Sequence, residues 1–116
     1  MTDRKLLNRW LRWLKRKFPL IYPVRVLLVP RNKVPECGDG HCTCNYTVGN
    51  KHPDRFTIHL ADDLNWRETQ GTLWEEWAHA QRMHLFSVGD PQEHDEVYAV
   101  LFNRIQQGWN QHVSQE

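Results

Sequence analysis

Thr-Leu-Trp-Glu-Glu-Trp-Ala-His-Ala, residues 72–80, combines charged and apolar side chains at helical spacing. On a helix, Glu75 and His79 lie one turn apart and about 40° apart around the axis, so both can reach one point in space. Glu76 lies about 100° from Glu75, beside that point. The opposite side carries apolar residues that would face a core, namely Leu73, Trp77 and Ala80. The stretch therefore predicts a helix with two candidate metal ligands on one face. It also predicts a further carboxylate beside them and an apolar face on the opposite side.

A third candidate ligand is His94, which lies 15 residues after His79, in the next predicted helix. The positions four and seven residues further on are Tyr98 and Leu101, so we expect the imidazole to point inward with the apolar stripe. The positive end of the helix disfavours imidazolium, which keeps the ring neutral and able to bind a metal. We therefore expect Glu75, His79 and His94 to hold one divalent ion. Tyr98 itself is interpreted as an ordinary core residue, and the alternative is a site-lining phenol that donates a hydrogen bond to a developing oxyanion.

Capping signals indicate where these two helices begin. We expect the first helix to cover about residues 69–86, with Asn65 and Glu68 as a candidate capping box. We expect the second helix to begin with Asp90 as its cap and Pro91 at its first position. Its apolar residues then repeat at helical spacing: Val97, Tyr98, Leu101, Phe102, Ile105 and Trp109.

The residues before the motif predict an N-terminal helix and a small sheet. Residues 4–18 are typical of an amphipathic helix that ends at Pro19. Residues 24–29 are rich in β-branched side chains and leucine, and residues 55–60 alternate between apolar and polar side chains, so both segments predict strands. Residues 30–54, rich in Pro, Gly, Asn and Asp, are interpreted as a long loop, with a candidate hairpin around residues 44–48.

The chain has the length and composition of one globular domain. It has 116 residues, of which 40% are hydrophobic and 25% charged, both ordinary values. No apolar run approaches the roughly 18–20 residues of a membrane span, and no signal-peptide pattern opens the chain. We therefore expect a single α+β domain over residues 1–116, cytoplasmic and without a membrane span.

The motif Glu-Glu-Trp-Ala-His-Ala resembles the His-Glu-Trp-Ala-His-Ala signature of small SprT-like and phage-encoded zincin proteins. The likeness covers roughly residues 22–109 and is specific only in the motif helix and near His94. It implies a minimal zincin-like fold, with an N-terminal helix, a small sheet, the motif helix and a C-terminal helix. It also implies a phage origin and a zinc metallopeptidase, a hydrolase in which Glu76 acts as general base on a metal-bound water. His79 and His94 match zinc ligands of that family.

One position departs from the family pattern, because Glu75 stands where the family has its first histidine. A carboxylate binds zinc at about the same distance as an imidazole, so a three-ligand geometry survives. An anionic ligand, however, reduces the net charge of the metal and with it the acidification of bound water. Three interpretations stay open: a working zinc centre with two His and one Glu, a site for a harder ion, or a zincin-like fold that has lost catalysis.

Three cysteines, Cys37, Cys42 and Cys44, lie within eight residues. An odd, clustered set is a poor disulfide framework. The C-x4-C-x-C spacing also differs from the paired C-x2-C knuckles of standard zinc fingers and ribbons. A Gly-rich turn containing cysteine is therefore favoured over a second zinc site at these residues.

Positive charge is concentrated at the N-terminus, where residues 1–17 carry seven Lys or Arg and one Asp. The simplest interpretation is a packing helix with a solvated basic side. The alternatives are a nucleic-acid surface or an interfacial membrane helix. The predicted function is a metal-dependent peptidase acting on a peptide or protein substrate, with the strand at residues 55–60 offering its edge to the peptide. The alternative function is a catalytically silent zincin-like binding module that contacts nucleic acid through the basic helix.

Overall fold

The computed structural model describes residues 3–45, 47–49, 54–85 and 95–115. The helices and strands are, in chain order, α1 (Arg4–Lys17), β1 (Val24–Val29), β2 (Gly40–Asn45), β3 (Arg55–Ala61), α2 (Trp66–Leu85) and α3 (Glu96–Ser114). Two single-turn 3-10 helices, η1 (Arg31–Lys33) and η2 (Pro35–Cys37), lie between β1 and β2. This is the predicted α+β fold. Among the described helices, none combines the length and apolar character that a bilayer crossing requires.

The strands form one mixed sheet in the order β1-β3-β2. β1 runs parallel to β3 with Val26 opposite Ile58, and β2 runs antiparallel to β3 with Cys42 opposite the same residue. β3 is therefore paired on both sides, and the prediction that it offers a free edge to a peptide is wrong. Within the described residues, the outer edges of the sheet belong to β1 and β2.

The strand β2 falls inside residues 30–54, so the prediction of a loop is wrong for residues 40–45. Its sequence, Gly-His-Cys-Thr-Cys-Asn, contains only one β-branched residue and no tyrosine, phenylalanine or tryptophan. The strand is instead stabilised by pairing with β3 and by packing on α2. Both partners are distant in sequence, which is why the local pattern gives no strand signal.

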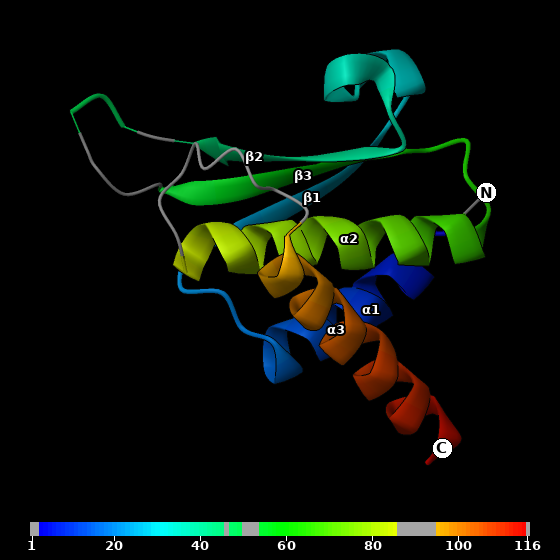
Figure 1. Cartoon of the computed structure of the whole chain (residues 1–116). Coiled ribbons are helices and arrows are strands. Elements are labelled where there is room, and N and C mark those ends of the chain that lie inside the picture. Colours follow the sequence, from blue (N-terminus) through cyan, green and yellow to red (C-terminus); the bar gives the residue numbers. More distant parts are fainter. Residues whose placement is uncertain (1–2, 46, 50–53, 86–94, 116) are drawn as a thin grey trace.

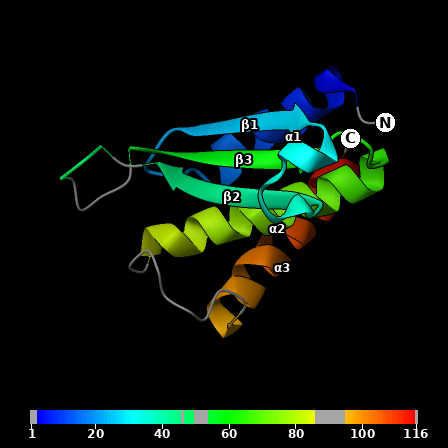
Figure 2. The ribbon, with the colours of Figure 1, turned by 90° about the horizontal axis from the view of Figure 1, so that it is seen from above.

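The helices cover one face of the sheet, and the two perpendicular views in Figures 1 and 2 agree on this arrangement. Alternation along β3 directs Phe56, Ile58 and Leu60 to this face, where each is fully buried. The register places Val26 of β1 and Cys42 of β2 beside Ile58 on the same face. The core therefore lies between the sheet and the helices, with α2 packed on β2 and β3.

Tryptophan side chains join the three helices. The ring centroid of Trp13 in α1 lies 5.8 Å from that of Trp74 in α2 and 5.2 Å from that of Trp109 in α3. Trp77 is fully buried, and its Nε1 donates a hydrogen bond of 2.9 Å to the Phe18 carbonyl just after α1. The apolar stripe predicted for the N-terminal helix is confirmed by its buried members: Leu7, Trp10, Leu11, Trp13 and Leu14.

The start of α2 is set by the predicted capping box, which is confirmed. The Glu68 backbone N–H donates to Asn65 Oδ1 at 2.9 Å, and the Asn65 N–H donates to Glu68 Oε1 at 3.1 Å. The helix begins directly after Asn65, at Trp66. Because the box satisfies two backbone donors that have no partner within the helix, it allows the helix to begin here although Gly71 follows within the next two turns.

The start of α3 differs from the prediction. The described helix begins at Glu96 with an extended Asp95 as its N-cap, whereas the predicted cap Asp90 and first residue Pro91 lie outside the described part of the chain. The Asp95 carboxylate accepts the Tyr98 N–H at 3.0 Å and forms an ion pair with Arg82 of α2 at 2.8 Å. The ion pair with Arg82 favours Asp95 as the cap residue. Because Arg82 lies in another helix, the capping residues in the local sequence do not reveal this contact.

We expect Asp95→Asn to lower the unfolding midpoint of the metal-free protein by roughly 5–10 °C at pH 7. Asparagine caps helices as well as aspartate does, so the substitution isolates the ion pair with Arg82. Hydrogen bonds from the Arg82 side chain and the Tyr98 backbone lower the pKa of Asp95 to about 2. The carboxylate therefore stabilises the fold fully above about pH 4 and loses this effect as the pH falls towards 2.

Thermal unfolding between pH 7 and pH 2, in the presence of a chelator, measures this difference. The midpoints of the native protein and the variant should converge at the acidic end, because the native carboxyl is then also protonated. A difference that stays constant over the whole pH range would contradict the ion pair as its source.

Candidate functional site

The face of α2 that carries the motif carboxylates is set by the buried side of the helix. Leu73 and Trp77 are fully buried in the core, which fixes the rotation of α2 about its axis. This rotation leaves Glu75 exposed and His79 partly exposed. Glu76 is buried, with 7% of its surface exposed. The helix therefore presents an accessible carboxylate and imidazole one turn apart, with a sheltered carboxylate beside them.

The edge strand β2 lies directly over Glu76. Gly40 comes so close to α2 that a Cβ atom at this position would lie 2.5 Å from Thr72 Cγ2 and 3.3 Å from Glu76 Cγ. Cys42 faces the same side of β2, and burial, with a further contribution from the Glu76 carboxylate, raises the pKa of its thiol well above the usual value. Glu76 is therefore held between a helix and a strand, largely shielded from bulk water.

Tyr98 of α3 contacts the motif face of α2. Its ring stacks on the imidazole of His79, with centroids 4.5 Å apart and ring planes inclined by 26°. Burial, followed by the charges of Glu75 and Glu76, raises the pKa of Tyr98 to about 12. The phenol therefore stays protonated near neutral pH and can donate a hydrogen bond. Tyr98 packs against the edge of the core, where it is partly buried, and it also contacts the motif histidine, as the alternative site-lining interpretation requires.

The third predicted ligand, His94, lies outside the described residues, which resume at Asp95. Within the described residues, no group of three His, Cys, Asp or Glu side chains is arranged to hold a metal ion. Glu75 and His79 still supply a carboxylate oxygen and an imidazole nitrogen from adjacent turns, which is donor chemistry that zinc accepts. The ion pair between Asp95 and Arg82 also ties the residue next to His94 to the turn of α2 that follows His79.

The three cysteines occupy two different settings. Cys42 and Cys44 belong to β2 and share the face that packs on α2, where the Cys44 thiol donates to Met83 Sδ at 3.2 Å. Cys37 is exposed at the end of η2. All three are free thiols. The favoured interpretation as a Gly-rich turn is therefore wrong for Cys42 and Cys44, which are strand residues.

Gly40 and Cys42 are the site residues that the sequence did not indicate. Their only local signal is the alternation of small or weakly polar residues at positions 40, 42 and 44. Because this alternation covers three positions without a β-branched residue, it is weaker than the surrounding loop signal. The contact joins Gly40 to Thr72 and Glu76 of α2, which lie more than thirty positions further along the chain.

Comparisons of the chain with protein-family models, with curated proteins and with solved structures find no match. Evidence for a function therefore comes from the motif on α2 and from the side chains gathered around it. These are the exposed Glu75, the partly exposed His79, the sheltered Glu76, and Tyr98 on α3.

Proposed function

We propose that this protein is a zinc-dependent peptidase of the zincin type. The observation that carries the proposal is the position of Glu76, a buried carboxylate beside the accessible pair Glu75 and His79. A general base has to be held near the attacking water, and shielding from bulk solvent strengthens its electrostatic interactions. The resemblance of residues 75–80 to the zincin signature supports the same assignment. It also supports a phage origin and a cytoplasmic place of action.

In this proposal Glu75, His79 and His94 hold one zinc ion. When bound, the ion polarises the scissile carbonyl and lowers the pKa of water at the site. The carboxylate of Glu75 preserves a ligand at the first motif position, and sites with two His and one Glu carry out peptide hydrolysis in other proteins. The substitution of Glu for His is therefore compatible with catalysis.

The side chains around the motif have distinct roles in the proposed reaction. Glu76 accepts a proton from the attacking water and then transfers it to the leaving amine. Tyr98 donates a hydrogen bond to the oxyanion that develops on the scissile carbonyl, which requires the protonated phenol that its raised pKa provides. The outer edge of β2, which passes over Glu76, would pair with an extended peptide substrate.

We expect the purified protein to contain about one equivalent of zinc, and the double variant Glu75→Ala, His79→Ala to retain less than roughly a tenth of it. The reason is that two of the three proposed ligands are removed from an exposed helix face whose buried side is unchanged. Elemental analysis after gel filtration measures the metal content.

A matched control is the double variant His41→Ala, Glu96→Ala, which removes one imidazole from β2 and one exposed carboxylate from the first turn of α3 and leaves Glu75 and His79 in place. It should keep the zinc content of the native protein. Equal zinc content in the native protein and in the Glu75→Ala, His79→Ala variant would end the proposal of a metal site on α2.

A further inference from the structure

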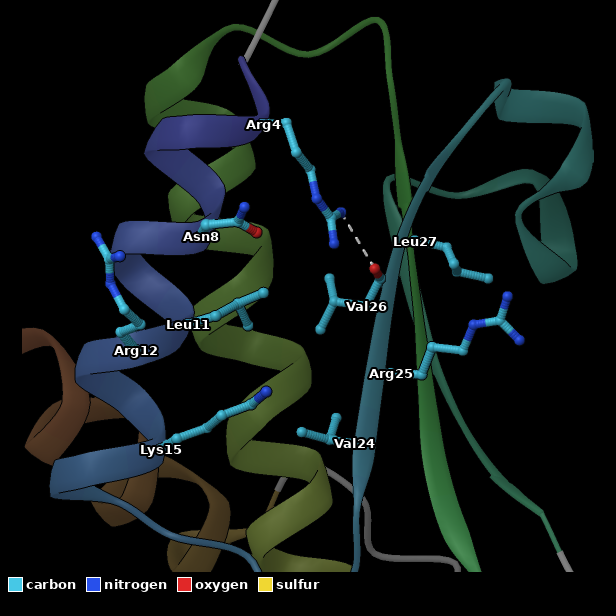
Figure 3. A pocket seen from close by; sticks show the side chains of 9 residues that line it. All are labelled: Arg4, Asn8, Leu11, Arg12, Lys15, Val24, Arg25, Val26 and Leu27. Atoms are coloured by element: carbon cyan, nitrogen blue, oxygen red, sulfur yellow. Dashed lines mark hydrogen bonds between the residues drawn. The ribbon is translucent and has the colours of Figure 1, made fainter.

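A hollow of about 520 Å³ lies between α1 and β1, at the edge of the sheet opposite to β2 (Figure 3). Leu11 and Val26 form part of its apolar lining, and Asn8 faces it from α1. Because β1 and β2 are the two outer strands of the sheet, this hollow is separate from the surface around Glu76. We call it the basic groove, for the charges described next.

Four cations line the basic groove: Arg4, Arg12, Lys15 and Arg25. None of the described residues that line it is acidic. In Figure 3, Arg4 and Lys15 point from α1 towards β1, whereas the side chains of Arg12 and Arg25 extend from α1 and β1 away from the space between them. Two cations therefore point into the groove, and two more border it on α1 and β1.

These cations differ from Arg31 and Arg82, two arginines of the described residues that have acidic partners. Arg31 is paired with Asp39 and Asp63, and Arg82 is paired with Asp95. Within the described part of the chain, Arg12, Lys15 and Arg25 have no acidic partner. Unneutralised cations gathered around one hollow produce a local positive potential that attracts anions.

The shape of the basic groove selects an extended anion. Arg4 and Lys15 are eleven residues apart on α1, which corresponds to about 16 Å along the helix axis. One strand of duplex DNA carries a phosphate about every 3.4 Å of axis, so the groove spans roughly four to five phosphates. A single inorganic phosphate would fill only part of this length.

Two features favour a phosphodiester backbone over a peptide strand or a base-specific contact. The Arg4 guanidinium donates to the Val26 carbonyl at 3.3 Å, which blocks part of the free edge of β1 against an added strand. No aromatic ring is among the described residues that line the groove, so it offers no surface for base stacking. Contacts from Arg and Lys to phosphate oxygens remain, and these carry no sequence information.

We propose that the basic groove binds the phosphodiester backbone of nucleic acid without sequence preference. Lys15 supplies a phosphate contact within the groove, Arg12 and Arg25 supply contacts at its borders, and Arg4 contributes while bonded to the Val26 carbonyl. The proposal is independent of the peptidase function, because the groove and Glu76 lie at opposite edges of the sheet.

The test is fluorescence anisotropy with a labelled DNA duplex of about 20 base pairs, titrated between about 50 and 200 mM salt. The native protein should bind with a slope of log affinity against log salt of about −3 to −4, as expected for three to four phosphate contacts. The variant Arg12→Gln, Lys15→Gln, Arg25→Gln should bind at least about tenfold more weakly, with a slope near −1. Thermal unfolding of each protein verifies that the fold is intact.

The matched control is Lys33→Gln, Arg67→Gln, Arg104→Gln, which removes the same charge from exposed positions outside the groove. Its affinity should fall by less than about threefold. An equal loss in both triple variants would assign the effect to net charge and overturn the site. The proposal also fails if native protein does not bind at the lowest salt concentration, or if polyglutamate competes as well as unlabelled DNA of equal charge.

Discussion

Glu76→Gln is expected to lower kcat/KM for hydrolysis of an unstructured protein substrate by about 10²–10⁴-fold, with zinc content unchanged. Glutamine has nearly the same shape as glutamate, so the packing beneath Gly40 and Cys42 should persist. It cannot accept the proton of the attacking water at neutral pH, and the loss therefore falls on the chemical step. Substrate binding along β2 should be little affected, so the change should appear in kcat more than in KM.

The control for this experiment is Glu96→Gln, which removes an exposed carboxylate from the first turn of α3. Its activity should stay within about threefold of the native protein. Full activity in Glu76→Gln would exclude this residue as the general base, and joint loss of zinc and activity would make Glu76 a ligand instead. Native protein that binds zinc without hydrolysing any peptide would favour the alternative, a catalytically silent zincin-like module.

The parts of the fold that could be predicted from sequence are those whose signal is local. The strand at residues 24–29 has the predicted bounds, because an apolar run between two prolines leaves little choice. The capping box of Asn65 and Glu68 is likewise complete within four residues. By contrast, β2 depends on pairing with β3, and the start of α3 depends on an ion pair to Arg82, so neither could be found from local patterns.

The same distinction applies to the candidate site. Helical spacing alone predicts that Glu75 and His79 share a face and that Glu76 lies beside it, and the structure places these residues accordingly. Spacing within one helix cannot show what covers that face. The stacking of Tyr98 on His79 and the close approach of β2 to α2 come from other parts of the chain. The environment that would tune Glu76 is therefore a tertiary property.

Gly40→Ala is expected to lower the unfolding midpoint by roughly 10 °C and to reduce peptide hydrolysis. A Cβ at this position would lie 2.5 Å from Thr72 Cγ2, well inside contact distance. Thr72 cannot easily rotate away, because its Oγ1 donates to the Glu68 carbonyl at 2.8 Å and its branched side chain has few rotamers. The strand β2 would therefore have to move away from α2, which exposes Glu76 to water.

A second substitution tests whether this contact is the cause. Thr72→Ser removes Cγ2 but keeps the hydroxyl that binds the Glu68 carbonyl, so it should restore most of the stability and activity lost in Gly40→Ala. Gly38→Ala is the matched control, because a Cβ there would meet only the Gly40 carbonyl oxygen at an ordinary 3.9 Å. Stability should then change by less than about 2 °C. If Thr72→Ser fails to rescue Gly40→Ala, the close approach of β2 to α2 is not what holds the strand over Glu76.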